Sequence, residues 1–125
     1  MATRFFKCEL CGNVVQLVTV GGGPLACCGQ PMTELQPNTT DAAQEKHVPS
    51  VKIEGNKVMV QVGETAHPMD EDHFIEWIYV EGGACGQIAY LKPGEEPKAE
   101  FEVPCCKPTA VYAYCNKHGL WKKEL

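Results

Sequence analysis

A cysteine and a histidine stand three positions apart near the C-terminus, in the segment Cys115-Asn116-Lys117-His118-Gly119. The other three histidines of the chain, His47, His67 and His73, lie upstream. A structural zinc site closes with four ligands, so four imidazoles and one thiolate exceed what zinc normally takes. Iron with a vacant coordination position fits this donor set better. A ferrous ion held in this way keeps a net positive charge, which would attract a small anion.

The four histidines all border predicted turns. His67 precedes Pro68, which biases the histidine to an extended conformation, and His73 follows an acidic loop and opens a predicted strand. An isolated histidine is more often a surface residue than a metal ligand. Four histidines that border turns, together with one Cys-x-x-His pair, favour a shared metal site over chance placement.

A second group of cysteines lies in the N-terminal part of the chain, as Cys8 and Cys11 followed by the neighbours Cys27 and Cys28. A segment below about 40 residues seldom builds a sufficient core without a staple, so this part is expected to fold around a metal. Four thiolates suit either zinc or a single iron, and a zinc-stabilised knuckle without redox chemistry stays an alternative. A disulfide between the two neighbouring cysteines is disfavoured because vicinal bridges are strained.

Turn signals and alternating apolar residues predict two units. Residues 1–36 form the cysteine-rich unit, with a strand-like run over 14–20 and a polar, turn-rich end. Residues 37–125 form the second unit, in which short strands are predicted at 51–54, 57–62, 74–81, 87–92, 99–103, 109–115 and 120–123. This number and spacing predict a mainly β chain whose larger unit is a seven-stranded antiparallel sandwich resembling the immunoglobulin fold.

Three local features refine this prediction. The pair Gly55-Asn56 suits the two-residue turn of a tight hairpin. Within the strand over 74–81, alternation places Ile75, Trp77 and Tyr79 on one face. The segment 41–46 is the candidate helix, with Asp41 as its N-cap.

Composition excludes several classes of function. The formal net charge of the 125 residues is -5, and no basic face for nucleic acid is evident. Apolar runs are strand-sized, so no membrane span is predicted, and the N-terminus lacks the features of a signal peptide. We therefore expect a cytoplasmic protein, in which eight cysteines indicate metal ligation or redox chemistry before a disulfide framework.

These motifs resemble those of the desulfoferrodoxins, the two-iron type of superoxide reductase. The resemblance covers nearly the whole chain and is carried by Cys8-x-x-Cys11, Cys27-Cys28, Glu45-Lys46-His47-Val48-Pro49, His67-Pro68-Met69, His73 and Cys115-Asn116-x-His118-Gly119. It implies a rubredoxin-like (desulforedoxin-like) domain over residues 1–36, with one iron on the four N-terminal cysteines. It also implies a catalytic iron in residues 37–125, with His47, His67, His73 and His118 equatorial and Cys115 axial.

The resemblance further implies one-electron reduction of superoxide to hydrogen peroxide without release of dioxygen. Lys46 would attract the anion and order the water that delivers protons, and Glu45 would occupy the sixth position of the resting ferric iron. By composition alone these two residues would be a solvated loop pair. A rubredoxin-type electron donor and a homodimer are family expectations as well.

Three cysteines, Cys85, Cys105 and Cys106, are not part of these ligand sets. We interpret them as packing or surface thiols rather than a third metal site, since no histidine remains to join them. Two other functions stay open on the sequence: a noncatalytic electron carrier that uses both irons, and a zinc-stabilised structural module. Colour distinguishes the zinc module, because zinc sites do not absorb visible light.

Overall fold

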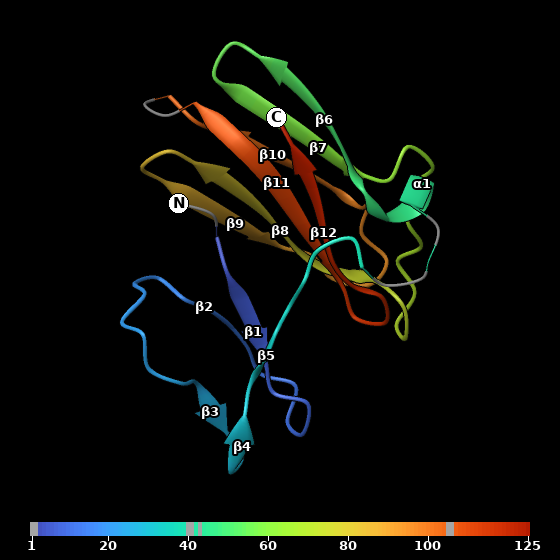
Figure 1. Ribbon diagram of the computed structural model, residues 1–125. Coiled ribbons are helices and arrows are strands. Elements are labelled where there is room, and N and C mark those ends of the chain that lie inside the picture. The colour runs from blue at the N-terminus through green and yellow to red at the C-terminus, as the bar shows by residue number, and fades with distance from the viewer. Residues whose placement is uncertain (1–2, 40–41, 43, 105–106) are drawn as a thin grey trace. The chain divides into compact units, whose positions relative to one another are not determined.

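The structure, a computed structural model, describes residues 3–39, 42, 44–104 and 107–125. The chain divides into two compact units, Met1–Gln36 and Pro37–Leu125 (Figure 1). The proposed helix cap Asp41 and the pair Cys105 and Cys106 lie outside the described residues. The mainly β character predicted from the sequence is confirmed, since strands dominate both units.

The N-terminal unit is built on the short strand β1 (Phe5–Lys7). β1 lies between β2 (Val14–Gln16) and β5 (Thr33–Glu34), and β3 (Ala26–Cys27) pairs with β4 (Gln30–Pro31) as a separate ribbon. The predicted strand over 14–20 is too long, because β2 ends at Gln16. Among the described residues of this unit only Phe5 and Cys8 are buried. A core of this size is too small to stabilise the unit by itself, so the unit needs a further stabilising element such as a bound metal.

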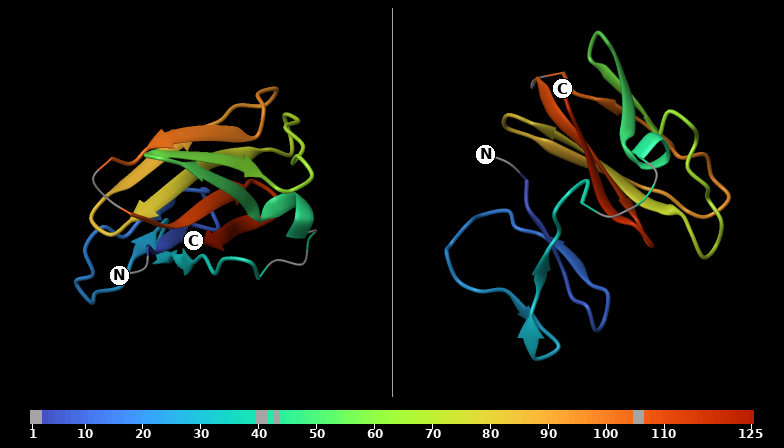
Figure 2. Two further views of the ribbon diagram at one scale, coloured as in Figure 1. Left: turned by 90° about the horizontal axis from the view of Figure 1, so that it is seen from above. Right: turned by 45° about the vertical axis from the view of Figure 1, so that its right-hand side comes forward.

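The larger unit is the predicted antiparallel sandwich. Its strands are β6 (Pro49–Glu54), β7 (Lys57–Val62), β8 (Ile75–Gly82), β9 (Gly86–Tyr90), β10 (Lys98–Glu102), β11 (Pro108–Cys115) and β12 (Gly119–Glu124). One sheet has the order β10-β7-β6 and the other the order β12-β11-β8-β9. Figure 2 shows these two sheets as separate layers. The apolar core lies between them and includes side chains from both, such as Val60 and Val111.

The hairpin of β6 and β7 forms at the predicted turn. Glu54 pairs with Lys57 in the ladder, so Gly55 and Asn56 are the two turn residues. Gly55 has a φ of 58°, which glycine adopts without the steric cost that a side chain would add. The register that this turn sets places Val58, Val60 and Val62 in the core.

A β-bulge changes which residues of β8 face the core. Cys115 pairs with Ile75 and the preceding Tyr114 pairs with Trp77, so one extra residue lies on β8. Ile75 consequently belongs to the core cluster together with Ile78 and Val80. The prediction that Ile75, Trp77 and Tyr79 share one face is wrong for Ile75, because simple alternation does not account for the bulge.

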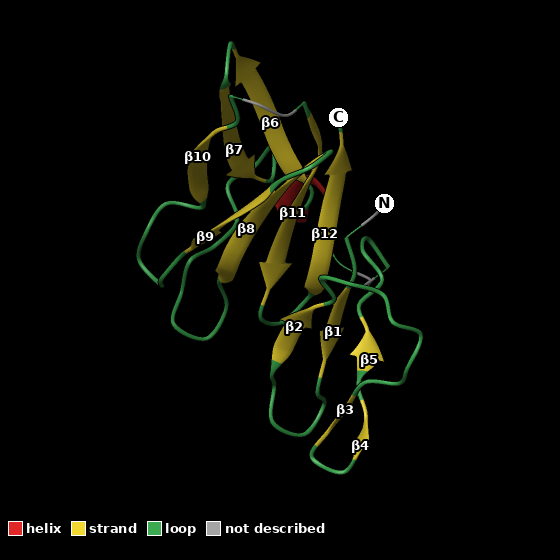
Figure 3. Ribbon diagram, turned by 90° about the vertical axis from the view of Figure 1, so that its left-hand side faces the viewer, coloured by secondary structure: helices red, strands yellow, loops and turns green. Residues whose placement is uncertain are grey.

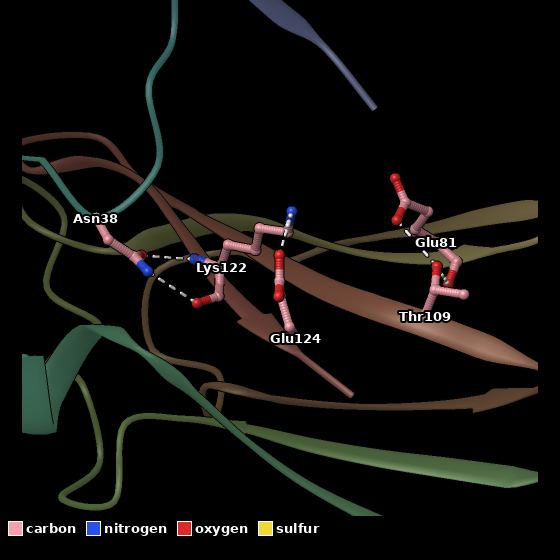
Figure 4. A network of polar contacts seen from close by, with 5 residues as sticks. All are labelled: Asn38, Glu81, Thr109, Lys122 and Glu124. Carbon is pink, nitrogen blue, oxygen red and sulfur yellow. Dashed lines mark hydrogen bonds and ion pairs between the residues drawn. The ribbon is translucent and has the colours of Figure 1, made fainter. Parts of the chain in front are cut away.

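Among the described residues, the outer edge of β12 is bonded by Asn38 and not by another strand. Asn38 donates from Nδ2 to the carbonyl oxygen of Lys122 at 3.1 Å, and its Oδ1 accepts from the Lys122 amide at 2.8 Å (Figure 4). The backbone of Asn38 also donates to the Leu120 carbonyl at 3.0 Å. Since unpaired edge groups invite association with other chains, these bonds protect the edge and hold residue 38 beside β12.

Three connections meet at one end of the sandwich: the segment that enters β6, the loop from β7 to β8, and the turn from β11 to β12. The first contains the short helix α1 (Gln44–His47), drawn in red in Figure 3. Of the helix predicted at 41–46, residues 44–46 are helical and the helix continues to His47, whereas residues 41 and 43 lie outside the described part of the chain. Among the described residues, no helix has the length and apolarity needed to cross a lipid bilayer.

Gly63 packs the β7–β8 loop against α1. Its φ is 82°, its amide donates to the Val48 carbonyl at 3.1 Å, and an added Cβ would lie 2.5 Å from the carbonyl oxygen of Lys46. Gly94 has a similar φ of 88°, but a Cβ there would meet nothing within 4 Å. A Cβ on Gly63 would also meet the carbonyl oxygen of Thr65 in the same loop, so the two glycines separate backbone strain from a clash with these two carbonyls.

We expect Gly63→Ala to lower the free energy of unfolding by about 2–5 kcal/mol, since left-handed strain and overpacking add. Gly94→Ala should cost only about 1–2 kcal/mol, because strain acts alone. Denaturant unfolding of the metal-loaded protein measures both. Equal losses in the two variants would contradict a close approach of Gly63 to the carbonyls of Lys46 and Thr65.

Candidate metal centres

The four N-terminal cysteines form one cluster, as predicted from their spacing. Their Sγ atoms all lie within 4.8 Å of one another, and Sγ pairs such as Cys11 and Cys27 at 3.6 Å, or Cys27 and Cys28 at 3.9 Å, are closer still. A tetrahedron with metal–sulfur bonds of about 2.3 Å has edges of about 3.8 Å, so these separations fit one tetrahedral ion. All four are free thiols rather than disulfides.

The turn between β3 and β4 explains how neighbouring cysteines can serve one metal. Cys27 pairs with Gln30, which leaves Cys28 and Gly29 as a two-residue turn with φ values of 53° and 77°. Positive φ at both central residues is the signature of a type I′ hairpin turn. Cys28 thus adopts a left-handed conformation that few residues take, and its side chain leaves the chain in a different direction from that of Cys27.

Backbone amides around Cys8 favour its thiolate. The Cys11 amide lies 3.5 Å from the Cys8 Sγ, and this bond is the main cause that lowers the pKa of Cys8 to about 6. The pKa of Cys28 is instead raised to about 12, chiefly because of its side-chain hydrogen bond with Cys11. A bound cation would favour the thiolate form of all four cysteines, because each sulfur would gain the same positive partner.

The second cluster lies at the end of the sandwich where the three connections meet. His47 ends α1, His67 and His73 belong to the β7–β8 loop, and Cys115 ends β11. Their donor atoms all lie within 4.8 Å of one another. His118, in the turn after Cys115, joins them: its Nδ1 is 3.0 Å from the Nε2 of His47. The structure thus brings together all five donors that the sequence predicted for this site.

The four imidazoles form a square. Ring centroids around its perimeter are 4.6 Å apart for His47 and His67, 4.8 Å for His67 and His73, 5.0 Å for His73 and His118, and 4.9 Å for His118 and His47. Neighbouring rings are nearly perpendicular, at 78–84°, whereas the diagonal pair His47 and His73 is 6.3 Å apart and inclined by only 30°. This is the arrangement of four nitrogen ligands around one ion.

The ring nitrogens inside the square fit a metal. His67 holds the Pro68 carbonyl oxygen at 2.6 Å from its Nδ1, which leaves Nε2 as the acceptor. Within the described structure, the buried Nε2 atoms of His67 and His73 have no hydrogen-bond partner. A metal–nitrogen bond of about 2.1 Å puts adjacent ligands about 3.0 Å apart, which matches the spacing of His47 and His118.

Burial favours the uncharged forms of the histidines and of Cys115. It lowers the pKa of His67 to about 4 and lowers the pKa of His73, so both imidazoles are neutral near pH 7. Burial also raises the pKa of the Cys115 thiol, which is fully enclosed. A thiolate at this position therefore needs a cation beside it.

Asn116 ties the cysteine loop to the histidine loop. Its Oδ1 accepts from the Phe74 amide at 2.9 Å, and its Nδ2 donates to the Asp72 carbonyl at 3.0 Å. Its own amide donates to the Phe74 carbonyl at 3.2 Å. These bonds grip the chain on both sides of His73. Sequence reasoning did not identify this role, although the position between Cys115 and His118 was a usable signal.

Glu45 and Lys46 lie on α1 immediately before His47, and both are exposed. Glu45 also lines an open cavity of about 570 Å³ that Glu64 and Lys123 border. The helix thus carries a carboxylate, an ammonium group and a metal ligand at consecutive positions. The roles predicted for Glu45 and Lys46 in substrate handling stay predictions.

Cys85 corrects an expectation. It is disulfide-bonded, so its interpretation as a packing or surface thiol is wrong. The pattern of metal ligands contained no information on this bond, because Cys85 lies in the β8–β9 turn, outside both clusters. The interpretation of Cys105 and Cys106 as thiols falls on residues that the structure does not describe.

Comparisons with known proteins agree with the two clusters. The family model for desulfoferrodoxin matches residues 39–124, and the model for the desulfoferrodoxin N-terminal domain matches residues 2–35. A desulfoferrodoxin homolog of Archaeoglobus fulgidus is 55% identical over 119 residues, which cover 95% of this chain and 94% of the relative. The desulfoferrodoxin of Nitratidesulfovibrio vulgaris is 47% identical over 123 residues, with 97% and 95% covered.

A solved structure is similar over the same length. The crystal structure of the superoxide reductase from Treponema pallidum has a TM-score of 0.83 to this chain and 30% sequence identity. The match covers 99% of this chain and 100% of that one. The similarity therefore extends over both units, and each unit contains one of the two donor clusters.

The separate clusters predict independent metal loss. Cys11→Ser should remove the metal from the N-terminal cluster alone, and His67→Ala should remove it from the histidine cluster alone, because each cluster lies within its own unit. Metal analysis of the two purified variants should give one ion per chain where the parent has two. Loss of both ions from either variant would contradict independent centres.

The low pKa of His67 predicts how acid affects the metal-free protein. The folded value of about 4 lies below the unfolded value of 6.5, so the unfolded chain binds more protons between these limits. The contribution of His67 to the free energy of unfolding should be fully present above pH 6.5 and should decrease as the pH drops toward 4. Denaturant unfolding across this range measures the slope, which His67→Gln should flatten. An equal slope in both proteins would rule out His67 as its cause.

Proposed function

The chain belongs to the desulfoferrodoxin family, and we propose that it is a superoxide reductase, which reduces superoxide to hydrogen peroxide at an iron held by four histidines and Cys115. It is an oxidoreductase with two iron centres, one on the four N-terminal cysteines and one on the histidine cluster. The single observation that carries the function is the square of imidazoles beside a buried thiol, in which two inward nitrogens have no hydrogen-bond partner among the described residues.

Iron, when bound, supplies the one electron that superoxide needs to reach the level of peroxide. The imidazoles hold the ion without adding charge, and the Cys115 thiolate adds one negative charge. A ferrous site of this kind therefore carries a net charge of about +1, which favours an anionic substrate. Two protons complete the balance, since superoxide, one electron and two protons give hydrogen peroxide.

Lys46 and Glu45 are the residues that we assign to substrate handling. The chain as a whole is acidic, with a net charge of -5, so its overall field repels superoxide. A lysine next to His47 supplies local positive charge that opposes this field, and its ammonium group can order the water that delivers protons. Glu45 is proposed to cover the iron in the resting oxidised state and to leave it when substrate arrives.

The N-terminal centre has a different part. Four cysteines saturate a tetrahedral ion and leave no position for substrate, so the reaction belongs to the histidine site. We propose that residues 1–36 act as a desulforedoxin-like electron-carrying domain and residues 37–125 as the reductase domain. A rubredoxin-type electron donor, a homodimer and a cytoplasmic location complete the proposal.

Metal content and product stoichiometry test the function. The purified protein should contain two irons per chain and absorb visible light. One equivalent of superoxide added to the reduced protein should oxidise the histidine site and yield one hydrogen peroxide. Release of dioxygen would instead indicate dismutation, and a colourless zinc protein would indicate a structural module.

We expect Lys46→Ala to slow the reaction with superoxide and to weaken its dependence on salt, because one steering charge is lost. Pulse radiolysis at several ionic strengths measures both effects. Lys57→Ala is the matched control: it removes the same charge at the opposite end of the β6–β7 hairpin, about 16 Å from Val62, which exceeds the Debye length of about 10 Å at 0.1 M salt. Equal rates for parent and Lys46→Ala would refute steering and leave the electron-carrier alternative open.

A further inference from the structure

Trp121 contacts the imidazole of one ligand, His47, and the backbone of another, His118. It lies on β12, is fully buried, and packs its ring against His47 with centroids 4.8 Å apart and planes inclined by 30°. Its indole Nε1 donates to the carbonyl oxygen of His118 at 3.0 Å. One side chain thus contacts both histidines whose donor atoms are 3.0 Å apart.

The hydrogen bond to His118 bears directly on the position of a donor atom. His118 faces the square with Nδ1, the ring nitrogen nearer to the backbone, whereas His67 and His73 place Nε2 there. Nδ1 is bonded to the ring carbon that carries the side chain, so an Nδ1 donor lies closer to its own main chain than an Nε2 donor does. A shift of the His118 carbonyl therefore moves the donor atom with it, and the indole N–H fixes that carbonyl.

The ring contact restrains His47 in the same way. His47 ends a helix of only four residues, which offers little rigidity of its own. The buried face of Trp121 provides the surface that the imidazole lies against. Since β12 is paired with β11 over six residues without a register shift, with Trp121 opposite Ala113, this surface belongs to a regular part of the sheet.

We propose that Trp121 is a positioning residue of the iron site, which fixes the edge of the square formed by His47 and His118. It touches neither substrate nor iron and acts through these two ligands. Residues that orient metal ligands typically change metal affinity by about 10–100-fold when they are replaced. The proposal rests on the proposed iron site and assigns to a core tryptophan the task of holding its geometry.

Trp121→Phe tests the proposal, because it keeps an aromatic ring and removes the N–H donor. Trp77→Phe is the matched control, since Trp77 is also buried but stacks on Tyr114 at 5.5 Å between centroids. The measurements are iron affinity by competition with a chelator, and the visible and electron paramagnetic resonance spectra of the oxidised histidine site. We expect Trp121→Phe to weaken iron binding about 10–100-fold and to shift the spectra, with Trp77→Phe unchanged in both.

A second variant isolates the hydrogen bond and serves if Trp121→Phe does not fold. The chain has two tryptophans, so a Trp77→Phe background allows Trp121 alone to be replaced by benzothienylalanine, in which sulfur takes the place of the indole N–H. Shifted spectra support the proposal. Parent spectra and affinity in this variant would overturn it, as would equal changes in Trp77→Phe. Failure of the parent to bind iron at the histidine site would instead refute the proposed function.

Discussion

The histidine site depends on an electrostatic constraint: buried donor atoms that face one another need a cation. Two ring nitrogens inside the square lack a partner within the described structure, and the pKa of the enclosed Cys115 thiol is raised by burial. Unpaired buried polar atoms cost free energy, and a buried thiolate costs more. Iron offsets both costs at once. The metal is therefore part of the stability of this end of the sandwich as well as the source of its chemistry.

The sandwich meets this constraint with the ends of its strands. α1, the β7–β8 loop and the β11–β12 turn all open at the same end, so ligands far apart in sequence meet there. Each connection is held by its own contacts: Gly63 packs against α1, Asn116 grips the chain around His73, and Trp121 touches His47 and His118. A rigid β core with functional residues in its connections is a common solution, because the core fixes where the connections begin.

The N-terminal unit also brings together donor atoms that need a cation. Its two buried residues among those described are Phe5 and one of its ligands, Cys8. Backbone amides and a left-handed Cys28 aim four sulfurs at one point, where like groups would otherwise repel. Its metal replaces the apolar core that so short a segment cannot build.

Residue type and spacing alone were enough to predict the donor groups, the seven sandwich strands and the β6–β7 turn, because ligand chemistry and alternation are local properties. Local patterns did not reveal the bulge that turns Ile75 toward the core, the left-handed Cys28, or the disulfide of Cys85. The contacts of Asn116 and Trp121 were equally hidden, since each joins residues from separate connections. The identity of the donor residues can thus be predicted from the sequence. How they are oriented is decided only where distant segments pack, because ring direction depends on neighbours that a linear pattern does not contain.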